Sequence, residues 1–165
     1  MRFLFLVLAL AISACGPSSG QIRAAKSAQY NAPAKSVLDV ALQVAQRTYK
    51  IGAMDFETLM FATVPQWYTR DGGRISPNTD GSSNGDFVNA GGGDVQVTLF
   101  VKIRQVEGGE MLVVVTARTF ELVAGSPQPR ELAIDDPGLP PWVLGRIDSL
   151  SVEIHDEAKK LFPTT

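Results

Sequence analysis

The residues whose side chains could carry out catalysis are few in this chain of 165 residues. Cys15 is the only cysteine and His155 the only histidine. A serine nucleophile would need His155 as its base, and no G-x-S-x-G nucleophile elbow occurs in the sequence. Zinc requires at least three good ligands, and the sequence has no cluster of cysteine and histidine. His155 falls on the polar face of a predicted helix, so we expect it to be solvated and not catalytic.

Neighbouring carboxylates are the remaining candidates for acid–base chemistry, because a glycosidase needs only two of them. The available pairs are Asp55 with Glu57 and Asp135 with Asp136. Both pairs fall in predicted turns, where acidic side chains are favoured because they bond to the backbone. Glycine-rich loops can cradle a phosphate when a helix follows them. The three glycines at residues 91–93 precede a predicted strand, so they offer no helix N-terminus to a phosphate. The sequence therefore predicts no enzyme and no cofactor.

A glycine-rich stretch contains oxygen-bearing side chains at alternate positions, namely Asn78, Asp80, Ser82, Asn84 and Asp86. Calcium is bound by oxygen ligands of this kind. Counted from Asp80, Gly85 fits the sixth position of an EF-hand loop, but Gly91 stands at the twelfth, where a glutamate is required. We therefore expect solvated turns here and no metal site.

The first fourteen residues have the layout of a secretory signal. A cationic start at residues 1–2 is followed by an apolar run at residues 3–12 and two small residues. The order of charged, apolar and small residues is typical of an export signal. The apolar run is about half as long as the stretch of about twenty residues that spans a bilayer. We therefore predict a signal peptide over residues 1–14 and not a membrane-spanning helix.

The residues at the end of this signal resemble a bacterial lipobox, in which an aliphatic residue and two small residues precede a cysteine: Ile12, Ser13, Ala14 and Cys15. The resemblance implies cleavage before Cys15 and acylation of its thiol and its new amino group. Two or more acyl chains hold a protein stably on a bilayer, at about 0.8 kcal/mol per buried CH₂. Gly16 stands where an acidic residue would resemble an inner-membrane retention signal, which favours the periplasmic face of the outer membrane.

Two segments have the composition of irregular chain. Residues 15–35 are rich in glycine, proline and serine near their start, and we expect a flexible tether. About twenty coil residues have a span of roughly 25 Å. Residues 70–93 form a long insertion that we expect to be disordered. The net charge is −2 and no basic cluster is present, which argues against a nucleic-acid partner.

The rest of the chain, residues 36–165, predicts one α+β domain. The predicted elements are a helix at 36–48 with Ser36 as its N-cap, strands at 49–54, 58–64, 94–106 and 111–123, and a helix at 141–161. Apolar residues alternate in the third strand and recur at helical spacing in the last helix. The fourth strand is apolar on both faces near its centre, so we expect a central position. Both helices should lie on one face of an antiparallel sheet, giving two layers.

Part of this order resembles a stretch of BamC-like envelope lipoproteins. The resemblance lies in the run from Tyr49 to Thr63, followed by Gln66, Trp67 and Tyr68: a helix precedes a strand, an acidic turn, a strand that ends in threonine, and a tryptophan. The same order of elements recurs in helix-grip-like domains. The resemblance implies an accessory subunit of an outer-membrane assembly machine, with no catalytic residues to carry over.

Aromatic residues are the remaining candidates for a functional surface: Trp67, Tyr68, Phe100 and Trp142. They either cap the core or form a patch that faces a partner, since tryptophan and tyrosine are enriched in interface hot spots. We expect a scaffold or accessory subunit that is anchored through Cys15 and binds an envelope protein. The alternative is a carrier or sensor that holds a lipid or other apolar ligand between helices and sheet. Acidic residues converging in a cleft would instead indicate a hydrolase.

Overall fold

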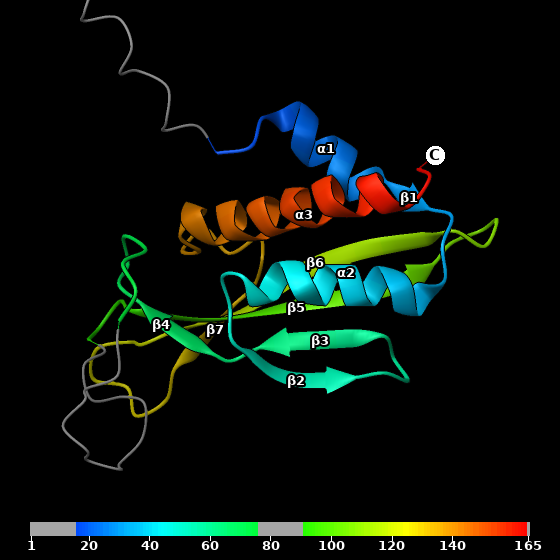
Figure 1. Ribbon diagram of the computed structural model, residues 1–165. Coiled ribbons are helices and arrows are strands. Elements are labelled where there is room, and N and C mark those ends of the chain that lie inside the picture. The colour runs from blue at the N-terminus through cyan, green and yellow to red at the C-terminus, as the bar shows by residue number, and fades with distance from the viewer. Residues whose placement is uncertain (1–15, 76–90, 165) are drawn as a thin grey trace, which may run out of the picture.

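The computed structural model describes residues 16–75 and 91–164, and these form an α+β fold with an antiparallel sheet (Figure 1). The elements are, in chain order, α1 (Ser19–Ser27), β1 (Gln29–Tyr30), α2 (Ala34–Gln46), β2 (Ile51–Asp55), β3 (Met60–Thr63), β4 (Gln66–Tyr68), β5 (Val95–Gln105), β6 (Met111–Glu121), β7 (Arg130–Leu132) and α3 (Pro141–Leu161). The predicted fold class is confirmed, and the sheet gains three short strands, β1, β4 and β7.

The two predicted helices are present as α2 and α3. The last helix has the expected bounds, with proline in its first turn. The predicted cap of the first helix at Ser36 is wrong, because α2 begins at Ala34 and its N-cap is Pro33. The carbonyl of Pro33 already accepts the backbone N–H groups of Ser36 and Val37 at 2.9 and 3.2 Å. Ser36 therefore lies inside the first turn, where its side chain cannot cap the helix.

The long hairpin of β5 and β6 is the centre of the sheet. The two strands pair over their whole length, and shorter strands flank them in the order β1-β6-β5-β3-β2. On the β5 side, β3 pairs with residues 100–102 and β4 pairs with residues 95–97. On the β6 side, β1 and β7 pair with opposite ends of the strand. β6 is thus flanked on both sides only at its ends, which confirms the expected central position in part.

A side chain bridges the gap between β3 and β4. Val64 and Pro65 separate these two strands, so the backbone of β5 lacks a strand partner at this point. The hydroxyl of Thr63 accepts the backbone N–H of Leu99 at 3.0 Å, and Thr63 is buried. A buried N–H without an acceptor would be costly. Thr63 therefore lets β5 run straight past the break.

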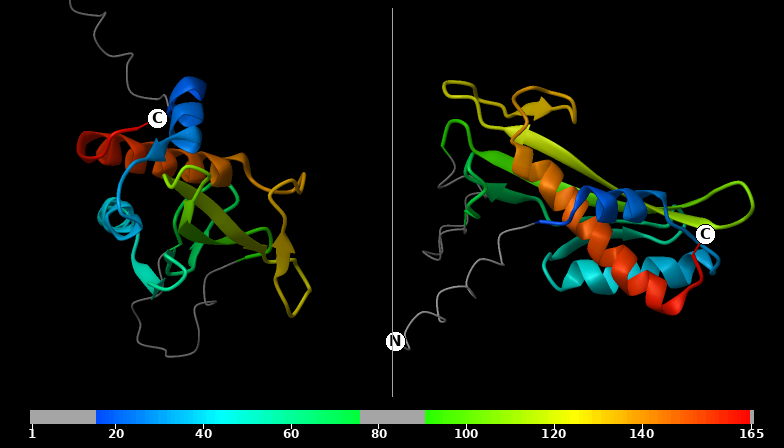
Figure 2. Two further views of the ribbon diagram at one scale, coloured as in Figure 1. Left: turned by 90° about the vertical axis from the view of Figure 1, so that its right-hand side faces the viewer. Right: turned by 90° about the horizontal axis from the view of Figure 1, so that it is seen from above.

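The core lies between the sheet and the helices. Alternate residues of β5 face the helices and are buried, as the sequence predicted. They meet buried side chains of α2 and α3, among them Val37, Leu38, Ala41, Val143, Leu150 and Ile154. Figures 1 and 2 show the helices on one side of the β5–β6 hairpin, with α1 lying across α3. The opposite face of the hairpin has no helix over it among the described residues.

The prediction of a flexible tether over residues 15–35 is the one that differs most from the structure. Residues 15–35 contain α1 and β1, and only the part of this range from Gly16 onward is described. Ser18 forms a capping box with Gln21, which starts α1. Ala25 and Ala28 are buried, and small side chains let α1 approach α3 closely. Helix α1 is therefore part of the domain. The glycine and proline that suggested a tether, Gly16 and Pro17, only precede the N-cap of this helix.

Candidate functional site

An arginine stacked between aromatic rings forms the most distinctive cluster of the domain. The guanidinium carbon of Arg146 lies 4.3 Å from the ring centroid of Tyr68 and 5.3 Å from that of Trp142. The two rings are themselves in contact, with centroids 5.1 Å apart. Cations are attracted to the faces of aromatic rings within about 6 Å. Trp142 and Arg146 are four residues apart on α3, so they share one helix face.

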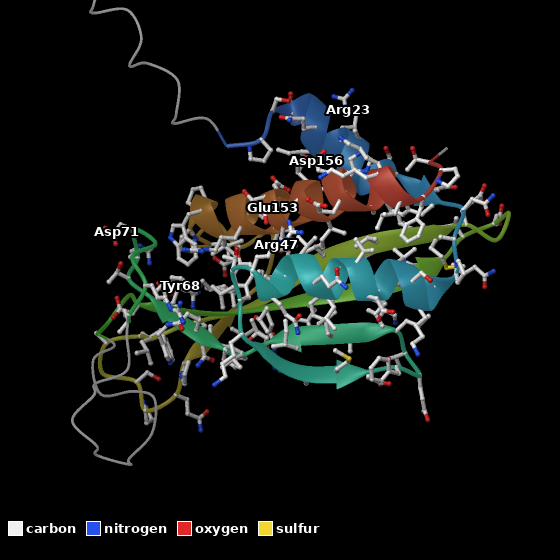
Figure 3. All side chains as sticks on the ribbon, in the orientation of Figure 1. Arg23, Arg47, Tyr68, Asp71, Glu153 and Asp156 are labelled. Atoms are coloured by element: carbon white, nitrogen blue, oxygen red, sulfur yellow. The ribbon has the colours of Figure 1, made fainter. Side chains whose placement is uncertain are left out.

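A tight turn after β4 holds this cluster in place. The side chain of Trp142 donates Nε1–H to the carbonyl of Arg70 at 2.9 Å, and Arg146 donates Nη2–H to the carbonyl of Gly72 at 3.3 Å. Thr69 closes the turn through two backbone hydrogen bonds with Gly73 and Gly72. Figure 3 shows Tyr68 below the N-terminal end of α3 and Asp71 on the loop beside it. The described start of the predicted insertion is thus ordered against α3.

Gly72 is required in this turn for two reasons. Its φ is +93°, a conformation that side chains with a Cβ rarely adopt. A Cβ at this position would also lie 3.1 Å from the ring of Trp142. The glycine therefore lets the backbone approach the indole closely enough to accept the hydrogen bond from Arg146.

A shallow open groove runs beside the cluster. Its volume is about 430 Å³, and it lies between the start of α1, the first half of α3 and the chain that follows α2. The lining residues are Gly16, Pro17, Ile22, Tyr49, Trp142, Gly145, Arg146, Asp148 and Ser149. The groove is thus mostly apolar, with Arg146 on its wall.

The charges in the groove are those of Asp148 and Arg146, and Arg146 also interacts with the hydroxyl of Tyr49. Asp148 forms an ion pair with Lys26 of α1 at 2.6 Å, so its charge is balanced. Burial raises the pKa of Tyr49, although a hydrogen bond with Arg146 and the charge of Arg146 oppose that rise. Among the ion pairs of the described residues, none involves Arg146, and its Nε has no hydrogen-bond partner there. In the part of the chain that the structure describes, residues 16–75 and 91–164, Arg146 is therefore a cation without a balancing carboxylate.

The four predicted partner-facing aromatics divide between two places. Tyr68 and Trp142 belong to the cluster, where Tyr68 is buried and Trp142 half-buried. Trp67 pairs with Gln96 and Phe100 with Thr116, so both side chains lie on the face of the sheet away from the helices. Trp67 is buried there and Phe100 is half-buried. The sequence identified the residues but did not show that they belong to two faces.

Phe100 lies at the centre of an outer sheet face, the side of the hairpin without helices. The register places it between Ala62 of β3 and Thr116 of β6. Its diagonal neighbours include Met60 and Val114, Lys102 follows it on the same face of β5, and Leu112 lies further along this face opposite Arg104; the apolar ones are half-buried. Arg104 and Arg118 add exposed positive charge to this face, and Arg118 pairs with Glu131 at 2.8 Å. The outer sheet face thus has an apolar centre and a largely basic rim.

His155 is not simply solvated as we expected. Its Nδ1 lies 2.9 Å from the hydroxyl oxygen of Tyr30, which is buried. Burial and then the charge of Lys159 lower the pKa of His155, while Asp156 opposes them. The expectation was wrong because the partner lies in β1, within the segment predicted as a tether. This pair joins β1 to α3, and both its members are held by the fold.

The remaining predicted residues take part in turns. Asp55 accepts the backbone N–H groups of Glu57 and Thr58 at 2.8 and 3.1 Å, and Asp136 accepts that of Gly138 at 2.7 Å. One member of each acidic pair, Asp55 and Asp136, therefore has the turn role that the sequence indicated. The predicted anchor Cys15 and the calcium-like series Asn78, Asp80, Ser82, Asn84 and Asp86 lie outside the described residues.

Two further features concern binding and membranes. Within residues 16–75 and 91–164, the histidine, cysteine and acidic side chains form no group of three that could hold a metal ion. The helices described here include none that is long and apolar enough to cross a bilayer. Tyr49 and Arg146 were not predicted as site residues from the sequence, although the spacing of Arg146 from Trp142 indicated a shared helix face. Neither a scan against protein-family models nor a search of curated proteins found a match to this chain.

Proposed function

We propose that this chain is a lipoprotein of the outer membrane, anchored on the periplasmic side through acylated Cys15. In this proposal its domain is a non-catalytic scaffold or accessory subunit of an envelope complex. The residues Ile12, Ser13, Ala14 and Cys15 support the anchor. The resemblance to BamC-like lipoproteins supports the same role. An anchor of this kind limits the domain to partners that lie within reach of the bilayer.

The outer sheet face around Phe100 carries the scaffold proposal. Half-buried apolar side chains lie side by side on this face, and no described helix covers them. Apolar centres with polar rims are typical of protein interfaces. The exposed side chains of Lys102 and Arg104 add positive charge at the rim. A partner with an apolar centre and acidic groups around it would match this face.

The alternative, a carrier of an apolar ligand, has less support. Such a carrier needs a concave pocket of several hundred Å³ that buries its ligand. The space between helices and sheet is filled by side chains such as Leu38, Val101 and Ile154, which are almost fully buried. The groove beside Trp142 lies between α1 and α3 and is open to solvent. Its position is therefore unlike the internal cavity that a carrier would need.

The anchor is tested by the change Cys15→Ser. We expect the unchanged chain to sediment with membranes and to carry acyl groups in mass spectrometry of its N-terminal peptide. The variant should move to the soluble fraction, because its side chain cannot form the thioether. Equal membrane association of both chains would contradict the anchor.

The partner surface is tested by a photo-cross-linking residue placed at Phe100 in cells. The control carries the same residue at Gln43, which is exposed on α2 on the opposite side of the domain. We expect a discrete cross-linked species with one envelope protein at Phe100 and none at Gln43. The absence of an adduct at Phe100, or the same adduct at both positions, would contradict the scaffold role.

A further inference from the structure

The groove beside Trp142 begins at the residue that follows the predicted anchor. Gly16 lines the groove, and the Cα atoms of consecutive residues lie about 3.8 Å apart. A flexible tether would have placed the domain roughly 25 Å from the anchor. The structure instead attaches α1 to the domain through buried Ala25 and Ala28 and through the pair of Lys26 with Asp148. An acylated Cys15 therefore brings the groove to the level of the lipid headgroups.

The side chains of the groove have the chemistry of a membrane surface. Tryptophan and tyrosine are enriched where hydrocarbon meets headgroups, because their rings are apolar and their N–H or O–H is polar. Trp142 and Tyr49 line the groove together with Pro17 and Ile22. Arg146 supplies a positive charge that no described carboxylate balances. Arginine binds phosphate through its guanidinium N–H donors. In Arg146 the Nε is buried and one Nη2 N–H is given to the carbonyl of Gly72, so the donors that remain are on the Nη atoms.

We propose that this groove lies against the bilayer and binds the phosphate of a phospholipid headgroup through Arg146. The proposal rests on the proposed lipid anchor at Cys15. Because the anchor is the neighbouring residue, the contact is intramolecular in effect, and even a weak site is occupied at the high local lipid concentration. The aromatic rings of Trp142 and Tyr49 then lie at the interface beside the headgroup.

This docking fixes the orientation of the domain. The groove lies on the helical side, whereas Phe100 lies on the outer sheet face. With the helical side toward the membrane, the outer sheet face is turned away from the lipid and toward the periplasm. The two surfaces can then be used at the same time, one by the bilayer and one by a protein partner.

The orientation can be measured with two single-thiol variants, Ser149→Cys in the groove and Thr98→Cys on the outer sheet face. Both positions are half-buried, and acylation of Cys15 leaves each new thiol as the only free one. The acylated full-length mature chain is reconstituted in vesicles of phosphatidylethanolamine and phosphatidylglycerol that contain a lipid with a nitroxide on its headgroup. A fluorophore on residue 149 should lose its emission, and one on residue 98 should keep it. Equal quenching at both positions, or quenching at residue 98 alone, would overturn the proposal.

The role of Arg146 needs its own variants. The change Arg146→Gln should reduce quenching at residue 149, and high salt should do the same in the unchanged chain, because salt screens the attraction to phosphate. The control Arg47→Gln removes an exposed arginine that pairs with Glu157 at 3.2 Å, and it should leave quenching unaltered. Circular dichroism shows whether each variant is folded. Undiminished quenching in folded Arg146→Gln would overturn the assignment of the phosphate to this residue.

The native tryptophans give a second measurement that needs no label. In Trp67→Phe the remaining fluorophore is Trp142, because the chain has two tryptophans. Its emission should shift to the blue and be quenched by the nitroxide lipid. Mass spectrometry of the same sample separates the two proposals. A chain that lacks acyl groups on Cys15 contradicts the anchor, whereas an acylated chain whose groove is not quenched contradicts the docking alone. The docking is also overturned if an envelope protein, and not lipid, covers residue 149.

Discussion

The hydroxyl oxygen of Tyr30 lies 2.9 Å from Nδ1 of His155, across 125 residues of sequence. Tyr30 belongs to β1 and His155 to α3, so this contact joins the first strand of the sheet to the last helix. Tyr30 is almost fully buried, with 1% of its surface exposed. A buried hydroxyl is costly unless it is hydrogen-bonded. The sole histidine of the chain therefore helps to hold the segment next to the predicted anchor on the domain.

We expect His155 to titrate below its ordinary pKa of 6.5, because burial and the nearby charge of Lys159 disfavour the imidazolium. The unfolded chain then binds the proton more readily than the folded one. The free energy of unfolding should fall as the pH drops below about 6.5 and level off below the folded-state pKa. As His155 is the only histidine, one imidazole resonance in an NMR titration measures this value. A pKa above 6.5 would contradict the prediction.

The alkaline limit of stability should depend on Tyr30. Burial, with a smaller contribution from Asp156, raises its pKa to about 12 from the ordinary 10.0. Its contribution to stability is thus complete below pH 10 and is lost as the pH rises from there to about 12. Tyr30→Phe should remove most of this loss and should cost about 1 kcal/mol at neutral pH, the usual worth of a hydrogen bond. Urea unfolding at several pH values measures both effects. Identical alkaline profiles for the two proteins would contradict the assignment to Tyr30.

The sequence predicted the elements whose signal is local. The alternation in β5 and the apolar stripe of α3 follow from the pleat of a strand and the turn of a helix, so both appear with nearly the predicted bounds. α1 was missed because the residue that it buries is Ala25, and a single alanine gives little apolar contrast. The capping box of Ser18 and Gln21 was the available signal.

The candidate site was predictable only as separate residues. Trp142 and Tyr68 were identified by type, but their contact depends on how β4 and the turn after it meet α3. Such a contact is set by tertiary packing, which no period in the sequence reports. The same reason explains Phe100. Its position in a strand was predicted from the sequence. That Phe100 and Trp142 lie on opposite faces of the sheet follows only from the strand register.

At the break between β3 and β4, the hydroxyl of Thr63 takes the place of a backbone acceptor from a neighbouring strand, and this role can be tested. Thr63→Val keeps the shape of the side chain and leaves the N–H of Leu99 without its acceptor, 3.0 Å away in the native protein. An unsatisfied buried donor costs about 1–3 kcal/mol. The amide of Leu99 should also exchange faster with deuterium. Thr63→Ser keeps the hydroxyl, and it should keep the amide protected. Equal exchange in both variants would show that the hydroxyl does not matter.

The attachment of α1 can be tested with two adjacent alanines. Ala25 is buried and Ala24 is exposed on the same helix. Ala25→Glu places a charge against α3 and should release α1, because a buried charge without a partner is strongly unfavourable. Trypsin should then cleave rapidly after Arg23 and Lys26. Ala24→Glu should leave the native cleavage rate unchanged. Rapid cleavage of the unchanged protein at these two residues would mean that this segment behaves as a tether in solution.

The turn that supports Trp142 can be tested with two glycines that share a positive φ. Gly72 has φ +93° and Gly125 has φ +78°. Alanine in a left-handed conformation costs roughly 1–2 kcal/mol at either position. Gly125 has open space around a new Cβ, whereas at Gly72 the Cβ would lie 3.1 Å from the Trp142 ring.

Gly72→Ala should therefore lose more stability than Gly125→Ala, by about 1–3 kcal/mol if crowding adds as it does in overpacked cores. It should also displace the indole from Arg146, since the same turn accepts the hydrogen bonds of both side chains. Urea unfolding measures the first effect. The emission of Trp142 in a Trp67→Phe background measures the second. If both alanine variants lose the same stability and leave that emission unchanged, the close approach of the turn to Trp142 does not determine the geometry of the cluster.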